Sequence, residues 1–173
     1  DQFSIGAAAQ YYYGSLDPVV VEGWIHHQVD DAGLGLVAFG GLAPVMTYCR
    51  SLEHSGGCTP GIDWSGAPSA TLAQPFVLSA QEVRNQVPGM LIYGFTQAYA
   101  PFGGGILCIK TPIRRTELQN GGGNVGPPDC SGSFSYDMQA RIQAGGDPML
   151  VPGAVVYAQF WYRDPPSASG MAT

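Results

Sequence analysis

Few residues of this 173-residue chain have types and spacing that could do chemistry. The cluster that most resembles a metal site is His26-His27, followed by Asp30-Asp31. Adjacent residues of a strand point to opposite faces of a sheet, so these two imidazoles cannot easily ligate one ion. We therefore predict no metal and no cofactor, and interpret this stretch as a solvated strand end followed by a turn.

Catalytic motifs are equally weak. Residues 33–38 satisfy the loose GxGxxA pattern of dinucleotide sites, but Gly40-Gly41 and Pro44 would break the helix that must follow it. There is no GxSxG elbow, and the glycine-rich runs lack the Lys-Ser/Thr of a phosphate-binding loop. We expect no enzymatic activity. A secreted hydrolase stays open, because a glycosidase pair could form if folding brought together two of the carboxylates Asp63, Asp129, Asp137 and Asp164.

Four cysteines, Cys49, Cys58, Cys108 and Cys130, contain no CxxC pair. We predict two local disulfides that join sequence neighbours, Cys49 to Cys58 and Cys108 to Cys130, because each pair brackets a glycine-rich turn. The alternative is four buried free thiols in a cytosolic protein. Disulfides would favour an oxidising compartment, so we expect an extracellular or cell-surface location.

Aromatic side chains are the residues best suited to binding. Exposed rings on a sandwich could stack on sugars or form a protein interface. We predict that an interface includes Tyr11, Tyr12, Tyr13, Val19, Val21, Trp24 and Ile25. In the last apolar run, Phe160 and Tyr162 should point to one face and Trp161 to the other, so at least one of these faces should be buried.

The elements that must position these residues are strands. The chain has 25 Gly and 14 Pro and only 12% charged residues, which argues against a helix bundle. Apolar runs punctuated by Gly and Pro predict an all-β fold, a β-sandwich or jelly roll with short helical turns. The expected strands span residues 19–29, 35–39, 45–49, 61–65, 75–80, 89–95, 105–109, 113–118, 133–138 and 154–163. Short helices are expected over residues 79–86, where Ser79 and Glu82 have capping-box spacing, and 138–144.

Net charge and hydropathy limit the partners. A net charge of −6 disfavours nucleic acid and anionic membranes. The longest apolar stretch, residues 33–46, is too short and too rich in glycine to span a bilayer as a helix. The chain begins Asp1-Gln2-Phe3 without a basic region or initiator Met, as expected of a mature secreted chain or a fragment.

An ordered series of short motifs spans about two-thirds of the chain. The motifs are Tyr48-Cys49, Gly57-Cys58-Thr59-Pro60, Ser65-Gly66-Ala67-Pro68-Ser69, Pro88-Gly89-Met90-Leu91-Ile92-Tyr93-Gly94, Pro101-Phe102-Gly103-Gly104-Gly105-Ile106-Leu107-Cys108, Pro112-Ile113-Arg114-Arg115-Thr116, Gly122-Gly123, Asp129-Cys130-Ser131-Gly132, Leu150-Val151-Pro152-Gly153 and Ala158-Gln159-Phe160-Trp161-Tyr162-Arg163-Asp164-Pro165. This series resembles an uncharacterised module near the C-terminus of large secreted proteins of environmental bacteria. The resemblance implies a secreted, disulfide-bonded β domain of unassigned activity.

One departure from that module motivates a functional hypothesis. The module's Asp-Pro loop is followed by a final apolar strand, whereas this chain stops at Thr173, so we expect a sandwich that lacks its last strand. We divide the chain into an N-terminal strand-rich segment, residues 1–44, and a disulfide-stapled sandwich, residues 45–173. An open sheet edge is a template for another chain.

We therefore expect an extracellular structural protein that assembles with copies of itself, for example as a fibre joined by strand donation from residues 19–29. The alternatives are that residues 19–29 fill the gap within their own chain, and that the sequence is incomplete. The alternative function is an accessory carbohydrate-binding or adhesion module of a larger secreted protein, with a polysaccharide as partner.

Overall fold

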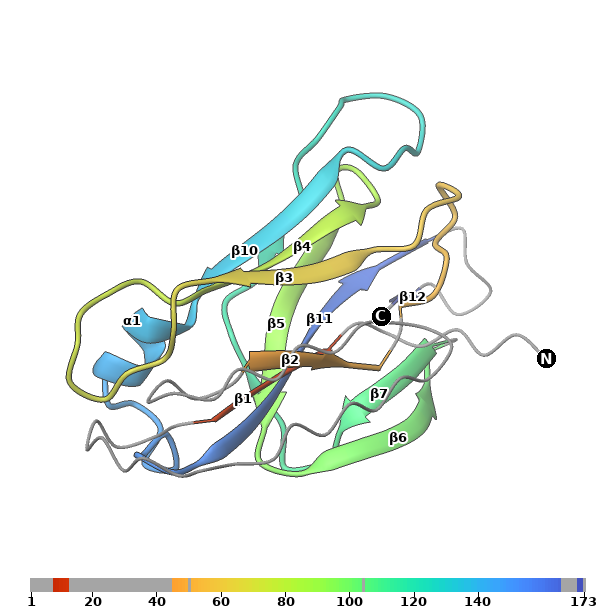
Figure 1. Ribbon diagram of the computed structural model, residues 1–173. Coiled ribbons are helices and arrows are strands. Elements are labelled where there is room, and N and C mark those ends of the chain that lie inside the picture. The colour runs from red at the N-terminus through yellow and green to blue at the C-terminus, as the bar shows by residue number, and fades with distance from the viewer. Residues whose placement is uncertain (1–7, 13–44, 50, 104, 166–170, 173) are drawn as a thin grey trace.

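The computed structural model describes residues 8–12, 45–49, 51–103, 105–165 and 171–172 (Figure 1). These residues form mainly antiparallel strands, with one short helix. The largest sheet contains β1 (Ala8–Tyr12), β2 (Val45–Tyr48), β5 (Pro88–Gly94), β8 (Arg114–Arg115), β9 (Gln119–Asn120), β11 (Val155–Arg163) and β12 (Met171–Ala172). The two smaller sheets contain β3 (Gly61–Ser65), β4 (Val77–Val83) and β10 (Gly132–Asp137), and β6 (Gln97–Phe102) with β7 (Gly105–Ile109).

The large sheet is organised around β5 and β11, its two longest apolar strands. Its order is β2-β1-β11-β5-β8, with β9 also paired to β5 and β12 to β11. In the β5–β11 ladder, Tyr157 lies opposite Gly94 and Tyr162 opposite Gly89. Alternate side chains of the two strands therefore point to the same face of the sheet. One face packs in the core, and the other carries the remaining side chains of both strands.

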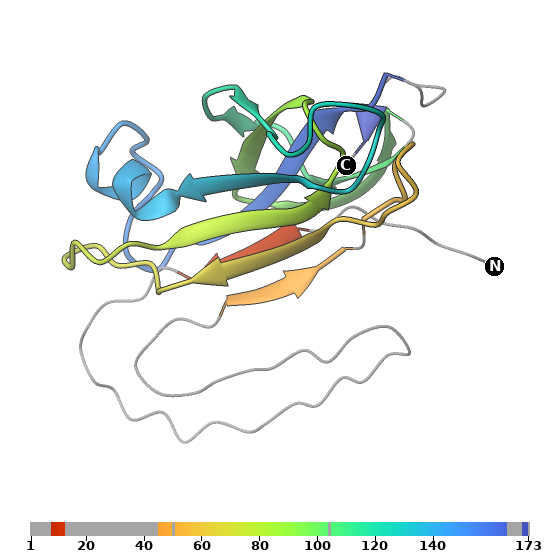
Figure 2. The same cartoon turned by 90° about the horizontal axis from the view of Figure 1, so that it is seen from above.

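The β10-β4-β3 sheet packs on one face of the large sheet, and the two make a β-sandwich (Figures 1 and 2). Phe160 of β11 stacks on Phe134 of β10, with ring centroids 5.9 Å apart. The core between the sheets includes Phe76, Leu78, Ala80, Val83, Leu91, Tyr93, Phe134, Val156, Ala158, Phe160 and Tyr162. The predicted all-β sandwich is thus confirmed, as is the outward direction of Trp161 relative to Phe160 and Tyr162.

The second face of the large sheet is partly covered by the β6–β7 hairpin. Gln159 of β11, which is fully buried, accepts a hydrogen bond from the Cys108 N–H at 3.1 Å and donates one to the Ile106 carbonyl at 2.9 Å. Tyr48 of β2 donates to the Cys108 carbonyl at 2.7 Å. Figure 1 shows this hairpin on the opposite side of the molecule from β3, β4 and β10.

Both disulfides are long-range, and the predicted pairing of sequence neighbours is wrong. Cys49 bonds to Cys108, 59 residues away, and Cys58 bonds to Cys130, 72 residues away. The turn between Cys49 and Cys58 needs no covalent clamp, because backbone hydrogen bonds between His54 and Cys58 and from the Gly57 N–H to His54 close it. The first disulfide instead ties the end of β2 to β7, and the second joins the loops that precede β3 and β10.

The helix α1 (Met138–Gln143) is capped at its N-terminus by Asp137, whose carboxylate accepts a hydrogen bond from the Ala140 N–H at 3.2 Å. It confirms the helix expected over residues 138–144. The helix expected over residues 79–86 is wrong, because β4 runs through this stretch and pairs with β3 and β10 on its two edges. Pairing on both edges and burial of Leu78 and Ala80 outweigh the local capping signal.

The N-terminal predictions are only partly within the described residues. The expected strands over residues 19–29 and 35–39 lie outside them. β1, which the sequence analysis did not predict, pairs with β11 on one edge and β2 on the other, with Ala8 opposite both Gln159 and Tyr48. β12 pairs with the last residues of β11, so two segments of the same chain lie along this edge of β11.

Candidate functional site

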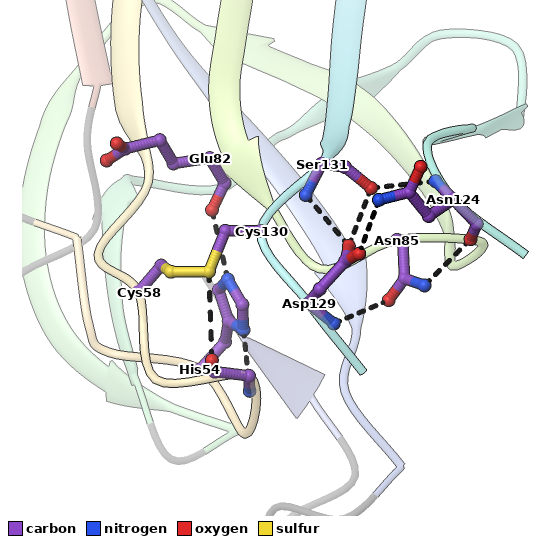
Figure 3. Close-up of a disulfide and its surroundings, with 9 residues drawn as sticks. His54, Cys58, Glu82, Asn85, Asn124, Asp129, Cys130 and Ser131 are labelled. Carbon is purple, nitrogen blue, oxygen red and sulfur yellow. Dashed lines mark hydrogen bonds between the residues drawn. A yellow bond between two sulfur atoms is a disulfide. The ribbon is translucent and has the colours of Figure 1, made fainter. Parts of the chain in front are cut away.

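Four clusters of polar side chains combine residue types that could carry chemistry, and the first surrounds a disulfide (Figure 3). Atoms of His54, Cys58 and Cys130 that could ligate a metal lie within 4.8 Å of one another. The two sulfurs are bonded to each other, and both ring nitrogens are engaged. Nδ1 of His54 accepts the Gly56 N–H, and Nε2 donates to the Glu82 carbonyl, each at 2.9 Å. The cluster therefore serves as a crosslink between loops.

A second cluster lies on the neighbouring loop in Figure 3. Asp129 accepts hydrogen bonds from the Ser131 hydroxyl at 2.6 Å, the Ser131 N–H at 2.9 Å and the Asn124 amide at 2.8 Å. These donors, Ser131 first, lower the pKa of the Asp129 carboxyl. Asn85 accepts the Asp129 N–H and donates to the Asn124 carbonyl. These polar groups hydrogen-bond to one another, so the cluster fixes the conformation of the loop.

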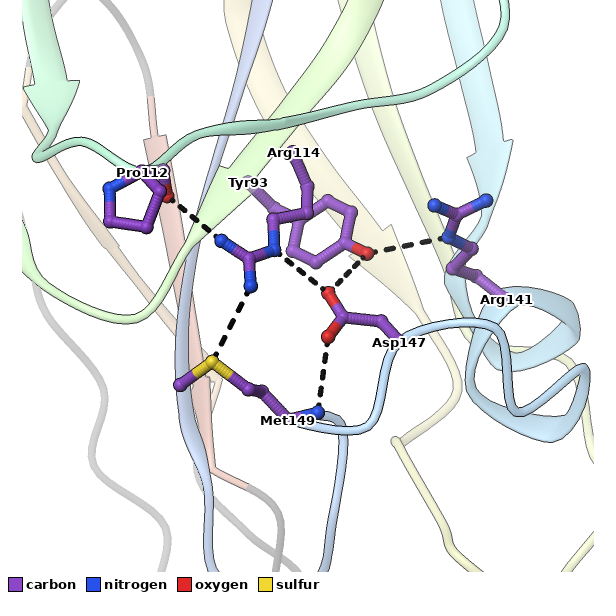
Figure 4. A network of polar contacts seen from close by, with 6 residues as sticks. All are labelled: Tyr93, Pro112, Arg114, Arg141, Asp147 and Met149. Atoms are coloured by element: carbon purple, nitrogen blue, oxygen red, sulfur yellow. Dashed lines mark hydrogen bonds and ion pairs between the residues drawn. The ribbon is translucent and has the colours of Figure 1, made fainter.

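The third cluster is centred on Asp147 (Figure 4). Its carboxylate accepts hydrogen bonds from the Tyr93 hydroxyl at 2.9 Å, Arg114 Nε at 3.2 Å and the Met149 N–H at 3.0 Å, while Arg141 donates to the Tyr93 oxygen at 3.3 Å. Burial raises the pKa of Tyr93. Burial alone would raise the pKa of Asp147 as well, but the donors Met149, Tyr93 and Arg114 outweigh it and lower that pKa.

At neutral pH, Asp147 is consequently ionised and Tyr93 protonated. General acid–base catalysis works best with a group whose pKa lies near the operating pH. Neither group meets that condition. The cluster instead joins β5, β8 and the segment around α1 through one carboxylate.

The fourth cluster holds Asp164, which is 1% exposed. The carboxylate pairs with Arg84 at 3.2 Å and accepts hydrogen bonds from the N–H and hydroxyl of Ser55. These contacts join the end of β11 to two loops. Of the four carboxylates considered for a glycosidase pair, Asp164 is buried in this contact, Asp129 holds its loop, Asp137 caps α1, and Asp63 is exposed on β3.

The best candidate for a binding site is an apolar pocket of about 590 Å³ on the outer face of the large sheet. Its floor comes from strand alternation. Leu91 and Tyr93 of β5 face the core, so Pro88, Met90 and Ile92 face outward. On β11, Trp161 and Arg163 also face outward, and Trp161 lies directly opposite Met90. We call this cavity the outer pocket.

The walls of the outer pocket come from the hairpin and the segment that follows it. Phe102 and Leu107 belong to the β6–β7 hairpin, Thr111 and Ile113 to the connection toward β8, and Leu118 to the turn before β9. Phe102 is 42% exposed and Leu118 is 64% exposed, so the rim itself is apolar. A cavity of this size with mainly apolar walls and few polar groups has the character of a small-molecule site.

The anchoring of the hairpin determines whether the outer pocket keeps its shape. Gly94 at the end of β5 is tightly packed, since a Cβ there would lie 2.6 Å from Cγ2 of Ile109. The Cys49–Cys108 disulfide attaches β7 to the end of β2, and the two hydrogen bonds between Gln159 and β7 attach it to β11. The hairpin is thus held on both β5 and β11, which makes a preformed cavity.

Trp161 has a feature that alternation alone did not predict. Its indole N–H is buried, and no hydrogen-bond acceptor contacts it among the residues described. An unsatisfied buried donor costs about 1–3 kcal/mol. The ring was predicted to point away from Phe160, and the structure places it in the floor of the outer pocket.

The interface residues predicted from the sequence fall mostly outside the described part of the chain. Tyr13, Val19, Val21, Trp24 and Ile25 lie there, as do the histidines and carboxylates of residues 26–31. Tyr11 and Tyr12 belong to β1, where Tyr11 lies opposite Val156 and Val45. The predicted interface therefore stays a prediction.

The structure does not bring the other aromatic candidates together on one exposed platform. Trp64 of β3 packs against the sandwich core, Tyr162 is buried in that core, and Trp161 faces the outer pocket. The outer pocket as a whole was not predicted from the sequence. Its one available signal was the outward face of two neighbouring strands, Met90 and Ile92 on one and Trp161 and Arg163 on the other.

Comparison with protein-family models, with curated proteins and with solved structures finds no match to this chain. The resemblance to secreted bacterial modules therefore stays an expectation. Within the described residues, no helix is long and apolar enough to cross a bilayer. The two disulfides are typical of proteins from oxidising compartments.

Proposed function

We propose that this domain is a non-enzymatic binding module of a secreted protein, and that the outer pocket receives a small, largely apolar molecule. The observation that carries the proposal is the cavity of about 590 Å³ between the hairpin and the outer sheet face. Pockets of roughly 300–1,000 Å³ with mainly hydrophobic walls are the usual form of small-molecule sites. An extracellular location fits the two disulfides.

The chemistry of the walls favours an apolar ligand over a sugar. A sugar carries many hydroxyl groups that need hydrogen-bond partners when they leave water. Most side chains that line the outer pocket, such as Met90, Ile92 and Leu107, offer no such partners. Only Thr111, Arg115, Trp161 and Arg163 of the described lining residues carry side-chain hydrogen-bonding groups, which is few for the hydroxyl groups of a sugar. A carbohydrate-binding role, which the sequence analysis kept open, has less support from this cavity than a role in binding an apolar molecule.

Binding of a neutral fluorescent probe tests the proposal. N-phenyl-1-naphthylamine, which brightens in apolar surroundings, should bind with saturation and with about one site per chain. Leu118→Trp should weaken binding severalfold by filling the exposed rim, and Met90→Trp should weaken it further by filling the floor. Leu72→Trp is the matched control, because Leu72 is 44% exposed and does not line the outer pocket. Unsaturable binding, or equal loss in the control, would overturn the proposal.

Self-assembly by strand donation stays a prediction. The segment proposed as donor, residues 19–29, lies outside the described residues. β1 of the same chain already pairs with β11 on the edge opposite β5. No contact among the described residues favours self-assembly over the binding function. Solution size separates the two functions, because a binding module should be a monomer whereas strand donation should give fibres or larger assemblies.

A further inference from the structure

We propose that the ligand of the outer pocket is an anionic amphiphile, an aliphatic chain that ends in a carboxylate, and that Arg115 and Arg163 recognise its charge. This inference deepens the proposed function and depends on it. It adds the chemical class of the ligand. The observation behind it is that two guanidinium groups line an otherwise apolar cavity.

The two arginines stand out from the other basic residues of the chain. Of the seven lysines and arginines, three form ion pairs within the fold: Arg84 with Asp164 and Arg114 with Asp147, each at 3.2 Å, and Arg141 with the exposed Glu117 at 4.0 Å. Arg115 and Arg163 form no ion pair with any residue that the structure describes, and both are exposed. Their positive charge is therefore available to a ligand.

The outer pocket contrasts in charge with the whole molecule. The chain has a net charge of −6, which would repel an anion at long range. None of the described residues that line the outer pocket is acidic. Two guanidinium groups beside apolar walls thus make a local positive region, and a low-dielectric cavity strengthens the attraction between an arginine and a carboxylate.

Register fixes how the two arginines are placed. Arg115 of β8 lies opposite Ile92 of β5, and Ile92 lies opposite Gln159 of β11. Arg115 is therefore two inter-strand spacings away from Gln159. Arg163 is four residues beyond Gln159 along β11. Strand spacing and rise put the two Cα atoms roughly 16 Å apart, on a diagonal of the sheet.

Apolar side chains occupy that diagonal. Met90 and Trp161 are directly paired in the floor between the two arginines. The arrangement fits a chain-like ligand that lies along the floor with its charged end at one arginine. A compact polar anion would make poor use of the apolar floor, because burial of methylene groups is the main source of affinity there.

The probe of the proposed function allows a direct test by displacement. Dodecanoate, kept below the concentration at which it forms micelles, should displace N-phenyl-1-naphthylamine, and each methylene added across a decanoate-to-dodecanoate series should tighten binding about fourfold. Dodecanol has the same chain without the charge. We expect dodecanoate to bind tenfold or more tighter than dodecanol to the wild-type protein.

Charge variants identify the source of the preference. R115Q/R163Q should lose about tenfold or more of its affinity for dodecanoate and should lose much less of its affinity for dodecanol. The single variants R115Q and R163Q show which arginine receives the carboxylate, and Arg→Lys at that position should restore part of the preference. K110Q is the matched control for each single variant, because it also removes one positive charge. Lys110 is exposed and does not line the outer pocket.

The outcomes separate this inference from the proposed function. Equal binding of dodecanol and dodecanoate, or an equal effect of K110Q, would overturn the inference and leave the binding function standing. Failure of the fluorescent probe itself to bind would overturn both. An anionic lipid headgroup offers the same chemistry as a free fatty acid, so sedimentation with phosphatidylglycerol vesicles distinguishes the sources. Binding to the vesicles without displacement by dodecanoate would contradict a pocket for free amphiphiles.

Discussion

At the scale of single residues, the ionisable side chains of the described fold contribute mostly to structure. Asp147 shows why, since three hydrogen-bond donors surround its carboxylate and lower its pKa. A carboxyl whose pKa is lower in the folded state than in the unfolded state adds stability above the unfolded pKa of about 3.9. That contribution is lost as the pH falls through the folded pKa.

We therefore expect Asp147→Asn to lower the free energy of unfolding by about 2 kcal/mol at pH 7. The difference from wild type should be smaller at about pH 2 than at pH 7, because the contribution of a lowered pKa declines once the pH falls below the unfolded pKa of about 3.9. Urea unfolding at both pH values measures this. Asp63→Asn is the control, because Asp63 is exposed on β3, and it should change the stability little at either pH. A constant difference across pH would show that lost shape, and not charge, explains the effect.

At the scale of elements, the outer pocket depends on how the β6–β7 hairpin is attached. The Cys49–Cys108 disulfide ends in β7, while Cys58–Cys130 joins loops and lies next to His54. The chain-entropy model gives similar stabilisation for their loops of 59 and 72 residues, about 4 kcal/mol each. The two disulfides should consequently differ in their effect on binding more than in their effect on stability.

The paired serine variants test this difference. C49S/C108S and C58S/C130S should both unfold at lower urea concentration, by comparable amounts. Only C49S/C108S should also weaken binding of the fluorescent probe, because its hairpin is released on the β2 side. Probe titrations below the unfolding transition of both variants make the comparison. Equal binding losses would mean that the outer pocket responds to global stability and not to the attachment of the hairpin.

At the scale of the whole molecule, solution size distinguishes the two functions considered for this chain. A binding module with a preformed pocket should run as a single chain in size-exclusion chromatography with light scattering, with or without dodecanoate. Fibres or regular assemblies of the non-reduced protein, seen by negative-stain electron microscopy, would support strand donation and contradict a monomeric binding module. We expect the monomer, because β1 and β12 of the same chain both lie along β11.

Much of the architecture was predictable because it depends on local sequence patterns. Gly61–Ser65 and Gly105–Ile109 were predicted with the observed bounds, and the alternation of Phe160, Trp161 and Tyr162 gave the direction of each ring. β6 was missed because it contains Pro101 and no β-branched residue. The false helix over residues 79–86 shows the opposite error, since its capping spacing is local and the pairing of β4 on both edges is not.

The sequence by itself thus determined an all-β, disulfide-bonded sandwich, because alternation, turn residues and scarce charge act over a few residues at a time. Tertiary structure alone decided which cysteines pair and where a cavity forms. Both depend on contacts between segments far apart in the chain, such as Cys49 with Cys108 and Gln159 with Ile106. Arg115 and Arg163 are 48 positions apart in the printed chain, and only the pairing of β8, β5 and β11 places them in one pocket.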